Sequence, residues 1–149
     1  MLTRRDFLKL GAAGAAGAAA AFLTTPAAAA GPPPLIWRGS ARHRYVALTY
    51  DDCYLVERLK ALEALLDEYP DFKITLFPVG MALINNQNKN PGVWNRFYEK
   101  GHDIGYHSYD HTNFGVMSDE TALVDYSRWL ETLSEVMGFT PRVRFGRPT

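Results

Sequence analysis

The sequence contains a single cysteine, Cys53, among its 149 residues. One cysteine cannot form a disulfide within the chain, so we expect a small buried residue and neither a disulfide-stabilised scaffold nor a reactive thiol. An excess of positive charge is also missing, because 16 lysines and arginines balance 16 aspartates and glutamates. No basic run follows the first ten residues. This charge pattern argues against nucleic acid as a partner and favours a neutral ligand.

A long apolar run is missing as well, even at the N-terminus. There TRRDFLKL precedes GAAGAAGAAAAFLTTPAAAA, which is weakly apolar and short for a membrane span. The pair Arg4 and Arg5 and the small residues before Ala30 are typical of a twin-arginine signal peptide. We predict that residues 1–30 are this signal, that the twin-arginine translocation machinery exports the chain to the periplasm or the cell exterior, and that no stable membrane span remains after cleavage. An uncleaved N-terminal anchor is the alternative.

In the rest of the chain, short apolar runs alternate with segments of helical periodicity. Residues 31–43 form a proline-rich lead that is typical of an extended linker. Strands are predicted at 44–50, 72–80, 102–106 and 142–145, and helices from 55 to 69, from a cap at Asn90 and Pro91 to Gly101, and from Ser118 to Gly138. The last helix is expected to bury Leu123, Tyr126, Trp129, Leu130, Leu133 and Met137. This order predicts an α/β fold with a parallel sheet, either an open sheet or part of a barrel.

Five polar side chains lie at or just past the ends of predicted strands: Asp51, Asp52, His107, His111 and Arg147. Because the carboxyl ends of parallel strands meet at one edge of a sheet, we expect these side chains to converge there. Two histidines and one carboxylate are enough ligands for zinc or a similar divalent ion that keeps positions open for water. A second carboxylate beside them is suited to accept a proton from that water.

Each of these residues also has an ordinary structural explanation. The histidines are spaced like many exposed loop histidines, Asp52 is placed to cap the next helix, and Arg147 is compatible with a surface charge. Their convergence on one edge favours the functional interpretation. Four residues fall outside this pattern. We assign structural roles to His43 and His102, and solvated or supporting roles to Asp103 and Asp110.

Three segments in this order resemble the ordered motifs of the polysaccharide deacetylases, the carbohydrate esterases that share the NodB homology domain. TYDDC stands where that family usually has T-F-D-D-G, HSYDH matches H-S/T-x-x-H, and RFGRPT resembles R-P-P-Y with its arginine. The resemblance runs from about residue 44 to the end. It implies that residues 44–149 form the N-terminal part of a distorted (β/α) barrel.

The resemblance also implies a chemistry. Asp51 would be the catalytic base and Arg147 the group that orients it, whereas the metal ligands would be Asp52, His107 and His111. The implied ion is divalent, zinc first, with cobalt, nickel, manganese or iron as alternatives. The implied reaction is metal-dependent hydrolysis of N-acetyl groups on an exported or cell-wall glycan, which makes the protein a hydrolase of C–N bonds other than peptide bonds.

The sequence departs from the family pattern at three motif positions and in length. Cys53 replaces the usual glycine, Tyr50 the phenylalanine and Thr149 the second proline. The chain also ends before the tryptophan-bearing segment and the leucine-histidine pair of family members, so we expect an incomplete domain that binds metal weakly and lacks the general acid.

Three alternative functions stay open. The first is a non-catalytic glycan-binding or degenerate protein with Tyr109 as a sugar contact, and the second is a related amidohydrolase of small amides. The third is a non-haem iron oxygenase, which the strand-helix alternation disfavours.

Overall fold

The computed structural model of the chain describes residues 35–36, 38–42 and 44–149. The predicted signal peptide, part of the proline-rich lead and His43 lie outside these residues. The chain divides into two units, Met1–Ser40 and Ala41–Thr149. The described residues of the first unit are exposed, and all described helices and strands belong to the second. In the described part of the chain, no helix is long and apolar enough to cross a membrane.

Three parallel strands of the second unit form a sheet in the order β1, β2, β3. β1 covers Thr49–Asp52, β2 covers Thr75–Pro78 and β3 covers Asp103–Ile104. The last residues of β1 and β2, Asp52 and Pro78, are partners in the register. The carboxyl ends of the strands therefore meet at one edge, as expected for the polar motifs that follow them. The predicted α/β fold with a parallel sheet is confirmed.

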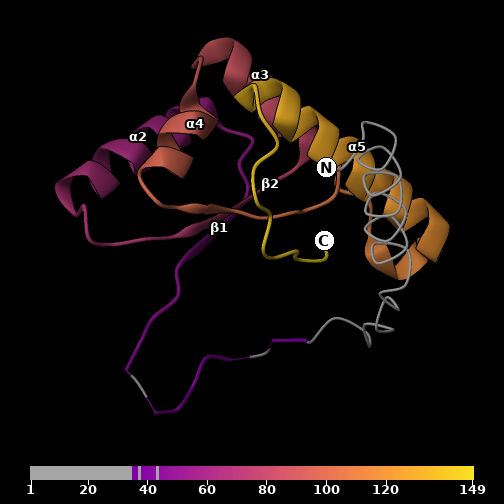
Figure 1. Cartoon of the computed structure of the whole chain (residues 1–149), viewed down its shortest axis with the longest axis horizontal. Coiled ribbons are helices and arrows are strands. Elements are labelled where there is room, and N and C mark those ends of the chain that lie inside the picture. Colours follow the sequence, from indigo (N-terminus) through magenta and orange to yellow (C-terminus); the bar gives the residue numbers. More distant parts are fainter. Residues whose placement is uncertain (1–34, 37, 43) are drawn as a thin grey trace, which may run out of the picture. The chain divides into compact units, whose positions relative to one another are not determined.

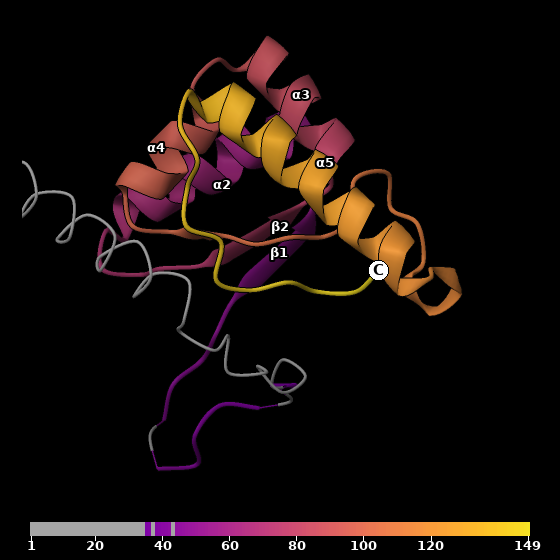
Figure 2. The same ribbon diagram turned by 45° about the vertical axis from the view of Figure 1, so that its right-hand side comes forward.

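The α-helices of the second unit gather on one side of this sheet, as Figure 1 and Figure 2 show from two directions. They are α2 (Val56–Glu68), α3 (Gly80–Lys89), α4 (Val93–Glu99) and α5 (Asp119–Met137), and a 3-10 turn, η1, covers Phe114–Val116. α5 packs across α3. Parallel strands are commonly covered by helices, because their side chains are largely apolar.

Two tryptophans lie at the centre of the core and tie the helices together and to the sheet. Trp94 and Trp129 are fully buried. The indole N–H of Trp129 donates to the carbonyl oxygen of Pro78 at 2.8 Å, and that of Trp94 donates to the carbonyl oxygen of Leu83 at 3.0 Å. Each ring fills apolar space while its polar group is satisfied. The prediction that Trp129 belongs to the core is confirmed.

Helix α5 begins and ends where the sequence predicts. Ser118 is its N-cap and accepts a hydrogen bond from the backbone N–H of Thr121 at 3.2 Å, and Gly138 ends the helix with a φ of 77°. The helix buries residues of the predicted face in its second half: Trp129, Leu133 and Met137. The prediction for Leu123 is wrong. This residue is 67% exposed, because the first turns of α5 reach beyond the other helices (Figure 2).

The first predicted strand, 44–50, is shorter than expected. Only Thr49 and Tyr50 of this run belong to β1. Tyr45 and Val46 are exposed, because none of the helices in the described part of the chain covers them. Apolar and β-branched residues therefore favour a strand here without being sufficient for one.

The predicted strand at 142–145 is absent, and this prediction is wrong. A single parallel bridge joins Tyr106 to Gly146 instead. It consists of hydrogen bonds from the N–H of Tyr106 to the carbonyl of Phe145 at 3.0 Å and from the N–H of Arg147 to the carbonyl of Tyr106 at 2.9 Å. After Tyr106 the chain turns into the loop that carries His107 and His111, here called the histidine loop, so no longer ladder forms. The bridge nevertheless brings Arg147 to the edge of the sheet.

Helix α3 is missing from the sequence-based prediction. Its sequence, GMALINNQNK, opens with glycine and contains three asparagines, which are poor helix formers. The helix forms because Ala82 and Leu83 pack into the core. Asn90, predicted to cap the next helix, ends α3 instead, and Gly92 with a φ of 75° is the N-cap of α4.

An ion-pair cluster connects α2 to α4, and the stability that it contributes is expected to depend on pH. The carboxylate of Glu63 accepts hydrogen bonds from Arg96 Nε at 2.7 Å and Nη2 at 3.0 Å and from Lys100 Nζ at 3.2 Å. These hydrogen bonds, chiefly those of Arg96, lower the pKa of the Glu63 carboxyl. A lowered pKa means that the ionised group stabilises the folded state above its unfolded pKa of about 4.3, and that this stability is lost as the pH falls through the folded pKa.

We therefore expect Glu63→Gln to lower the free energy of unfolding by about 1 kcal/mol at pH 7, a value reduced for solvent screening of Arg96 and Lys100. At pH 3 the loss should be smaller. Urea denaturation at both pH values measures it. Glu57→Gln is the matched control, because Glu57 is exposed and its ion-pair partner among the described residues is Lys60. An equal loss at both pH values would contradict the prediction.

Candidate metal centre

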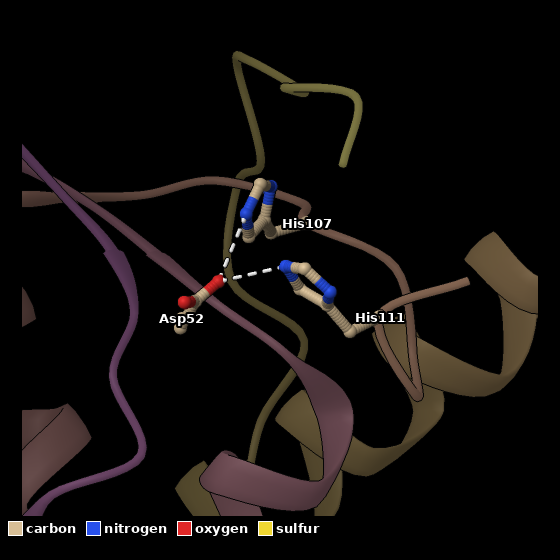
Figure 3. A group of neighbouring side chains, drawn as sticks. All are labelled: Asp52, His107 and His111. Carbon is tan, nitrogen blue, oxygen red and sulfur yellow. Dashed lines mark ion pairs between the residues drawn. The ribbon is translucent and has the colours of Figure 1, made fainter. Parts of the chain in front are cut away.

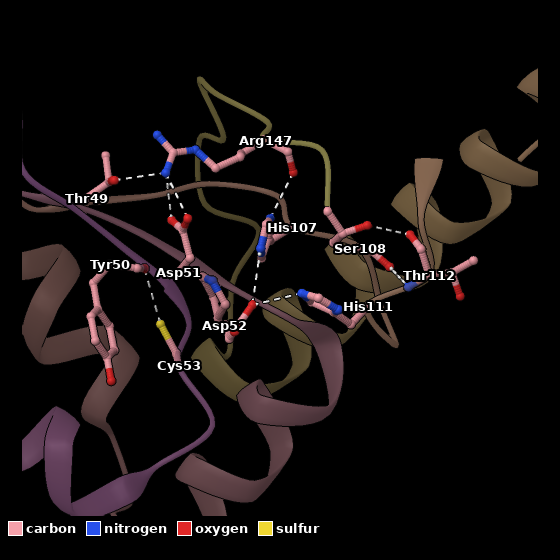
Figure 4. A network of polar contacts seen from close by, with 12 residues as sticks. Thr49, Tyr50, Asp51, Asp52, Cys53, His107, Ser108, His111, Thr112 and Arg147 are labelled. Atoms are coloured by element: carbon pink, nitrogen blue, oxygen red, sulfur yellow. Dashed lines mark hydrogen bonds and ion pairs between the residues drawn. The ribbon is translucent and has the colours of Figure 1, made fainter. Parts of the chain in front are cut away.

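The two aspartates at the end of β1 point to different partners because the chain leaves the strand there. In a regular strand, adjacent side chains lie on opposite faces. Asp52 and Cys53 both have a φ of 59°, which breaks this alternation. Asp51 then faces Arg147 and Asp52 faces the histidines (Figure 4). The alternative that Asp52 caps the next helix does not hold, since the N-cap of α2 is Leu55 and no side chain caps it.

The histidine loop directs both imidazoles to the carboxylate of Asp52. The Nε2 atoms of His107 and His111 lie 3.2 and 3.1 Å from the same oxygen, Oδ1 of Asp52 (Figure 3). Ser108 and His111 adopt a left-handed backbone conformation, each with a φ of 67°. Ser108 Oγ also accepts a hydrogen bond from the N–H of Thr112 at 3.1 Å, which closes the loop. The possible ligand atoms of the three residues all lie within 4.8 Å of one another.

The hydrogen bonding of His107 suits a metal ligand. Its Nδ1 lies 2.9 Å from the carbonyl oxygen of Arg147. A carbonyl only accepts hydrogen bonds, so Nδ1 is the donor, and in the neutral imidazole the lone pair is then on Nε2, the nitrogen that faces the cluster. This arrangement, in which the second ring nitrogen donates to an oxygen, is the usual one for a metal-binding histidine. Two imidazole nitrogens and one carboxylate oxygen therefore fit zinc or a similar divalent ion.

Arg147 holds the carboxylate of Asp51 beside this cluster. Its Nη1 donates to Asp51 Oδ1 at 3.0 Å and to Oδ2 at 2.8 Å, and it also lies 3.0 Å from the hydroxyl of Thr49 (Figure 4). Arg147 thus contacts the site twice, with its guanidinium at Asp51 and with its main-chain carbonyl at His107. All five predicted site residues are brought to one edge of the sheet, while their roles stay predictions.

Cys53 has the properties of a structural residue. It is 1% exposed, and its thiol donates to the carbonyl oxygen of Tyr50 at 3.6 Å. Burial, followed by the nearby charges of Asp51 and Asp52, raises the pKa of the thiol well above its usual value. The neutral thiol is a poor nucleophile and a poor metal ligand. The prediction of a small buried residue is confirmed.

The other polar residues singled out in the sequence lie outside the cluster. His102 is buried, and its Nδ1 accepts a hydrogen bond from the N–H of Ile74 at 3.3 Å, which confirms its structural role. Oδ1 of Asp103 lies 3.6 Å from Nη1 of Arg144. The carboxylate of Asp110 accepts a hydrogen bond from the hydroxyl of Thr112 at 2.5 Å. The ring of Tyr109, proposed as a sugar contact, packs under the guanidinium of Arg128 at 3.7 Å.

Asp125 of α5 supports the histidine loop and is a residue that the sequence did not reveal. Its carboxylate accepts hydrogen bonds from the N–H of Tyr109 at 2.9 Å and from the hydroxyl of Tyr106. Burial, together with this carboxylate, raises the pKa of the Tyr106 hydroxyl, so that the hydroxyl remains a donor. The only available signal was an acidic residue beside Tyr126 on the helix face that was predicted to be buried.

Removing the Asp125 carboxylate should destabilise the fold. We expect Asp125→Ala to lower the free energy of unfolding by about 2 to 3 kcal/mol, because two donors lose a charged acceptor. Tyr106→Phe should cost about 1 kcal/mol alone and much less in the Asp125→Ala background. Urea denaturation of the four chains measures this coupling. The control is Glu131→Ala, an exposed residue of the same helix, and additive losses would contradict the proposed network.

Comparisons with known proteins agree with this geometry. Residues 38–149 match the family model for polysaccharide deacetylase, and residues 1–21 match that for the twin-arginine translocation pathway signal sequence. The peptidoglycan-N-acetylglucosamine deacetylase of Bacillus cereus is 30% identical over 103 residues, which are 69% of this chain and 35% of that protein. The N-terminal match indicates export across a membrane.

Two solved structures resemble the chain over part of their length. One is a mutant, with restored enzymatic activity, of a CE4 family pseudoenzyme from Bacillus anthracis, 25% identical with a TM-score of 0.67, covering 78% of this chain and 40% of that one. The other is a family 4 acetyl xylan esterase from Clostridium thermocellum in complex with a cobalt ion, 26% identical with a TM-score of 0.53, covering 68% and 47%. The chain thus spans less than half the length of these relatives. Because the family model covers most of its residues, the chain belongs to the polysaccharide deacetylase family.

Proposed function

We propose that Asp52, His107 and His111 hold a divalent metal ion, zinc first, and that the chain forms part of an exported enzyme that removes N-acetyl groups from a cell-wall glycan. One observation carries this proposal. Two imidazole nitrogens and a carboxylate oxygen converge within 4.8 Å, next to a second carboxylate that an arginine holds in place. Neutral nitrogen donors combined with one carboxylate match catalytic zinc sites that keep a position open.

In the proposed hydrolysis, Asp51 and Arg147 have different roles beside the metal ligands. A bound ion would supply a Lewis acid that polarises the acetyl carbonyl and lowers the pKa of water. Asp51 is suited to be the general base that accepts the proton of the attacking water. Arg147 fixes the orientation of that carboxylate by donating to both of its oxygens. Water adds to the acetyl carbonyl, and the C–N bond breaks as the sugar nitrogen gains a proton, which balances the proton passed from water to Asp51. The products are acetate and a free amine on the sugar.

The relatives and the signal sequence support the proposed substrate class. One relative is named as a peptidoglycan-N-acetylglucosamine deacetylase and another as an acetyl xylan esterase. A protein exported by the twin-arginine route meets glycans in the periplasm or outside the cell, and both compartments are compatible with the proposal. The formal net charge of zero fits a substrate that does not need electrostatic capture.

Metal titration of the 149-residue chain tests the site. The metal-free protein is titrated with zinc in a calorimeter and with cobalt(II) in a spectrophotometer. We expect one ion per chain and the intense visible absorption of cobalt with few ligands. Binding that survives simultaneous removal of both imidazoles, in His107→Ala with His111→Ala, would place the ion elsewhere, and a chain that binds no divalent ion would refute the metal site.

Acetate release tests the reaction in the context of a whole enzyme. In a chimera, the matching segment of this chain replaces its counterpart in the Bacillus cereus relative, which supplies the remaining two thirds of the protein. We expect release of acetate from N-acetylglucosamine oligomers that stops on chelation and returns with zinc. A chimera that binds zinc and oligomer but releases no acetate would favour the alternative of a non-catalytic glycan-binding protein.

A further inference from the structure

The first residues of α3 contact both halves of the candidate metal centre. Three main-chain N–H groups there donate to carbonyl oxygens of the segments that carry the proposed ligands. These hydrogen bonds run from Val79 to Asp52 at 3.2 Å, from Gly80 to Ser108 at 3.1 Å and from Met81 to Tyr109 at 3.1 Å. One end of one helix therefore fixes the turn after β1 and the histidine loop relative to each other.

The approach of the histidine loop to this helix is close. A Cβ atom placed on Gly80 would overlap the ring of Tyr109. Glycine is thus required at the first position of α3 by contact with the loop and not by its own backbone conformation. The closeness indicates that α3 and the loop are packed as a unit, with no space for the loop to shift toward the helix.

Asn86, further along α3, is an unusual residue for a core. It is fully buried, and its Nδ2 donates to the carbonyl oxygens of Cys53 and Ala82, each at 2.8 Å. Its Oδ1 has no hydrogen-bond partner among the residues that the structure describes. A buried acceptor without a partner lowers stability, and an apolar side chain of similar size would avoid this loss. The side-chain amide of Asn86 is best explained by the backbone carbonyl oxygens to which its Nδ2 donates.

The carbonyl that Asn86 holds belongs to the turn that directs Asp52. Asp52 and Cys53 are both left-handed, with a φ of 59°. Residues other than glycine keep this conformation only where their surroundings enforce it. The turn is tight, because the N–H of Cys53 donates back to the carbonyl of Asp51 at 2.6 Å. Without the hydrogen bond from Asn86, the peptide after Cys53 could rotate toward an unstrained conformation, and the carboxylate of Asp52 would move with it.

We infer that Asn86 is a positioning residue of the metal centre. It locks the left-handed turn at Asp52 and Cys53, so that Oδ1 of Asp52 meets both histidine nitrogens. The main-chain hydrogen bonds of α3 hold the histidine loop in the matching position. This inference rests on the proposed metal site and deepens it, because it concerns how the ligands are held and not which substrate is hydrolysed.

The substitution Asn86→Leu tests the inference in the 149-residue chain. Leucine has a similar volume, removes both donors and also removes the acceptor that lacks a partner. We expect the dissociation constant for zinc to rise about 10- to 100-fold, the range typical of groups that orient a metal ligand. The visible spectrum of the cobalt(II) protein should change as well, since it reports the arrangement of ligands. Calorimetry and absorption, both below the unfolding temperature, measure the two effects.

Two variants of the same helix serve as controls. Asn85→Leu changes the adjacent asparagine, which is half-buried and whose Nδ2 lies 3.4 Å from the carbonyl of Tyr54. Leu83→Ala removes a fully buried side chain and should lower the stability of the fold. Both are expected to keep zinc affinity within about twofold, because neither removes a hydrogen bond to Cys53.

The outcomes separate the inference from the proposed function. If Asn86→Leu binds zinc like the wild type and has the same cobalt spectrum, the inference fails and the proposed function stands. The inference also fails if Leu83→Ala loses as much zinc affinity as Asn86→Leu does. Where Asn86→Leu does not fold, Asn86→Ala takes its place. The amide NMR signals of Asp52 and Cys53 in the metal-free chain give a readout without metal, and they should shift in the Asn86 variant and stay in Asn85→Leu. A wild-type chain that binds no divalent ion overturns the proposed function and with it a role in metal binding, and the NMR signals then decide only whether Asn86 holds the turn.

Discussion

Replacing Asp52 with alanine is expected to weaken zinc binding by more than about a hundredfold, beyond the range for groups that only orient a ligand. The reason is geometric and electrostatic. Oδ1 of Asp52 lies within 3.2 Å of both histidine nitrogens, and it is the only negative charge in the three-residue cluster. Two neutral imidazoles would remain, which is one ligand fewer than a catalytic zinc site has. Competition against a chelator of known affinity at pH 7 measures the change.

The histidine loop offers a matched control for this result. Asp110→Ala removes an aspartate of the same loop whose carboxylate accepts a hydrogen bond from Thr112 and lies outside the cluster. Its zinc affinity should stay within about threefold of the wild type, because the charge is exposed and screened. If Asp52→Ala and Asp110→Ala lose the same affinity, the effect is one of net charge and Asp52 is not a ligand.

The convergence of the site was predictable because it depends on topology. Asp52 and His107 lie far apart in the sequence, yet Asp52 ends one strand of the parallel sheet and His107 lies just past the end of another. The carboxyl ends of such strands must meet at one edge, so the residue order alone brought the two side chains together. The same reasoning placed Arg147 there. It succeeded although the strand predicted before Arg147 is reduced to one bridge, because a single pair of hydrogen bonds is enough to position the residue that follows.

The support of the site was not predictable, because it depends on contacts between segments with weak local signals. Nothing in GMALINNQNK has the apolar periodicity of a strong helix, and its asparagines favour turns. Only the packed structure shows that Asn86 meets the carbonyl of Cys53. The left-handed conformation of Cys53 had an indirect signal, since the family motif usually has glycine at this position. Glycine adopts a positive φ without strain, so the substitution by cysteine hid the turn.

The exposure of Leu123 shows a related limit of pattern analysis. The spacing of apolar residues along α5 defines a face correctly, and Trp129 and Leu133 are buried on it. The pattern does not tell how far a covering layer extends along the helix axis. Leu123 continues the stripe by sequence, and it is exposed because the core ends before it reaches that turn.

The substitution Asp51→Asn is expected to lower the rate of acetate release by the chimera by about 10²- to 10⁴-fold, the usual contribution of a general base. Asparagine has the same shape as aspartate, and its Oδ1 still accepts a hydrogen bond from Arg147. It cannot accept the proton of water at neutral pH, because an amide is not basic. Zinc affinity should change by less than about threefold, since Asp51 is not one of the three cluster residues. Initial rates at saturating oligomer and calorimetric titration of the same samples measure the two quantities.

Comparison with Arg147→Lys separates proton transfer from orientation. Lysine keeps the positive charge near Asp51 but cannot reproduce the fixed contact of the guanidinium with both carboxylate oxygens, so a loss of about tenfold, less than that of Asp51→Asn, is expected. Thr49→Val removes the third partner of the same guanidinium nitrogen and should cost least. This order follows if Asp51 acts on the proton and Arg147 acts through Asp51. Acetate release that persists in Asp51→Asn would mean that another group accepts the proton, and a parallel loss of zinc in that variant would identify Asp51 as part of the metal site.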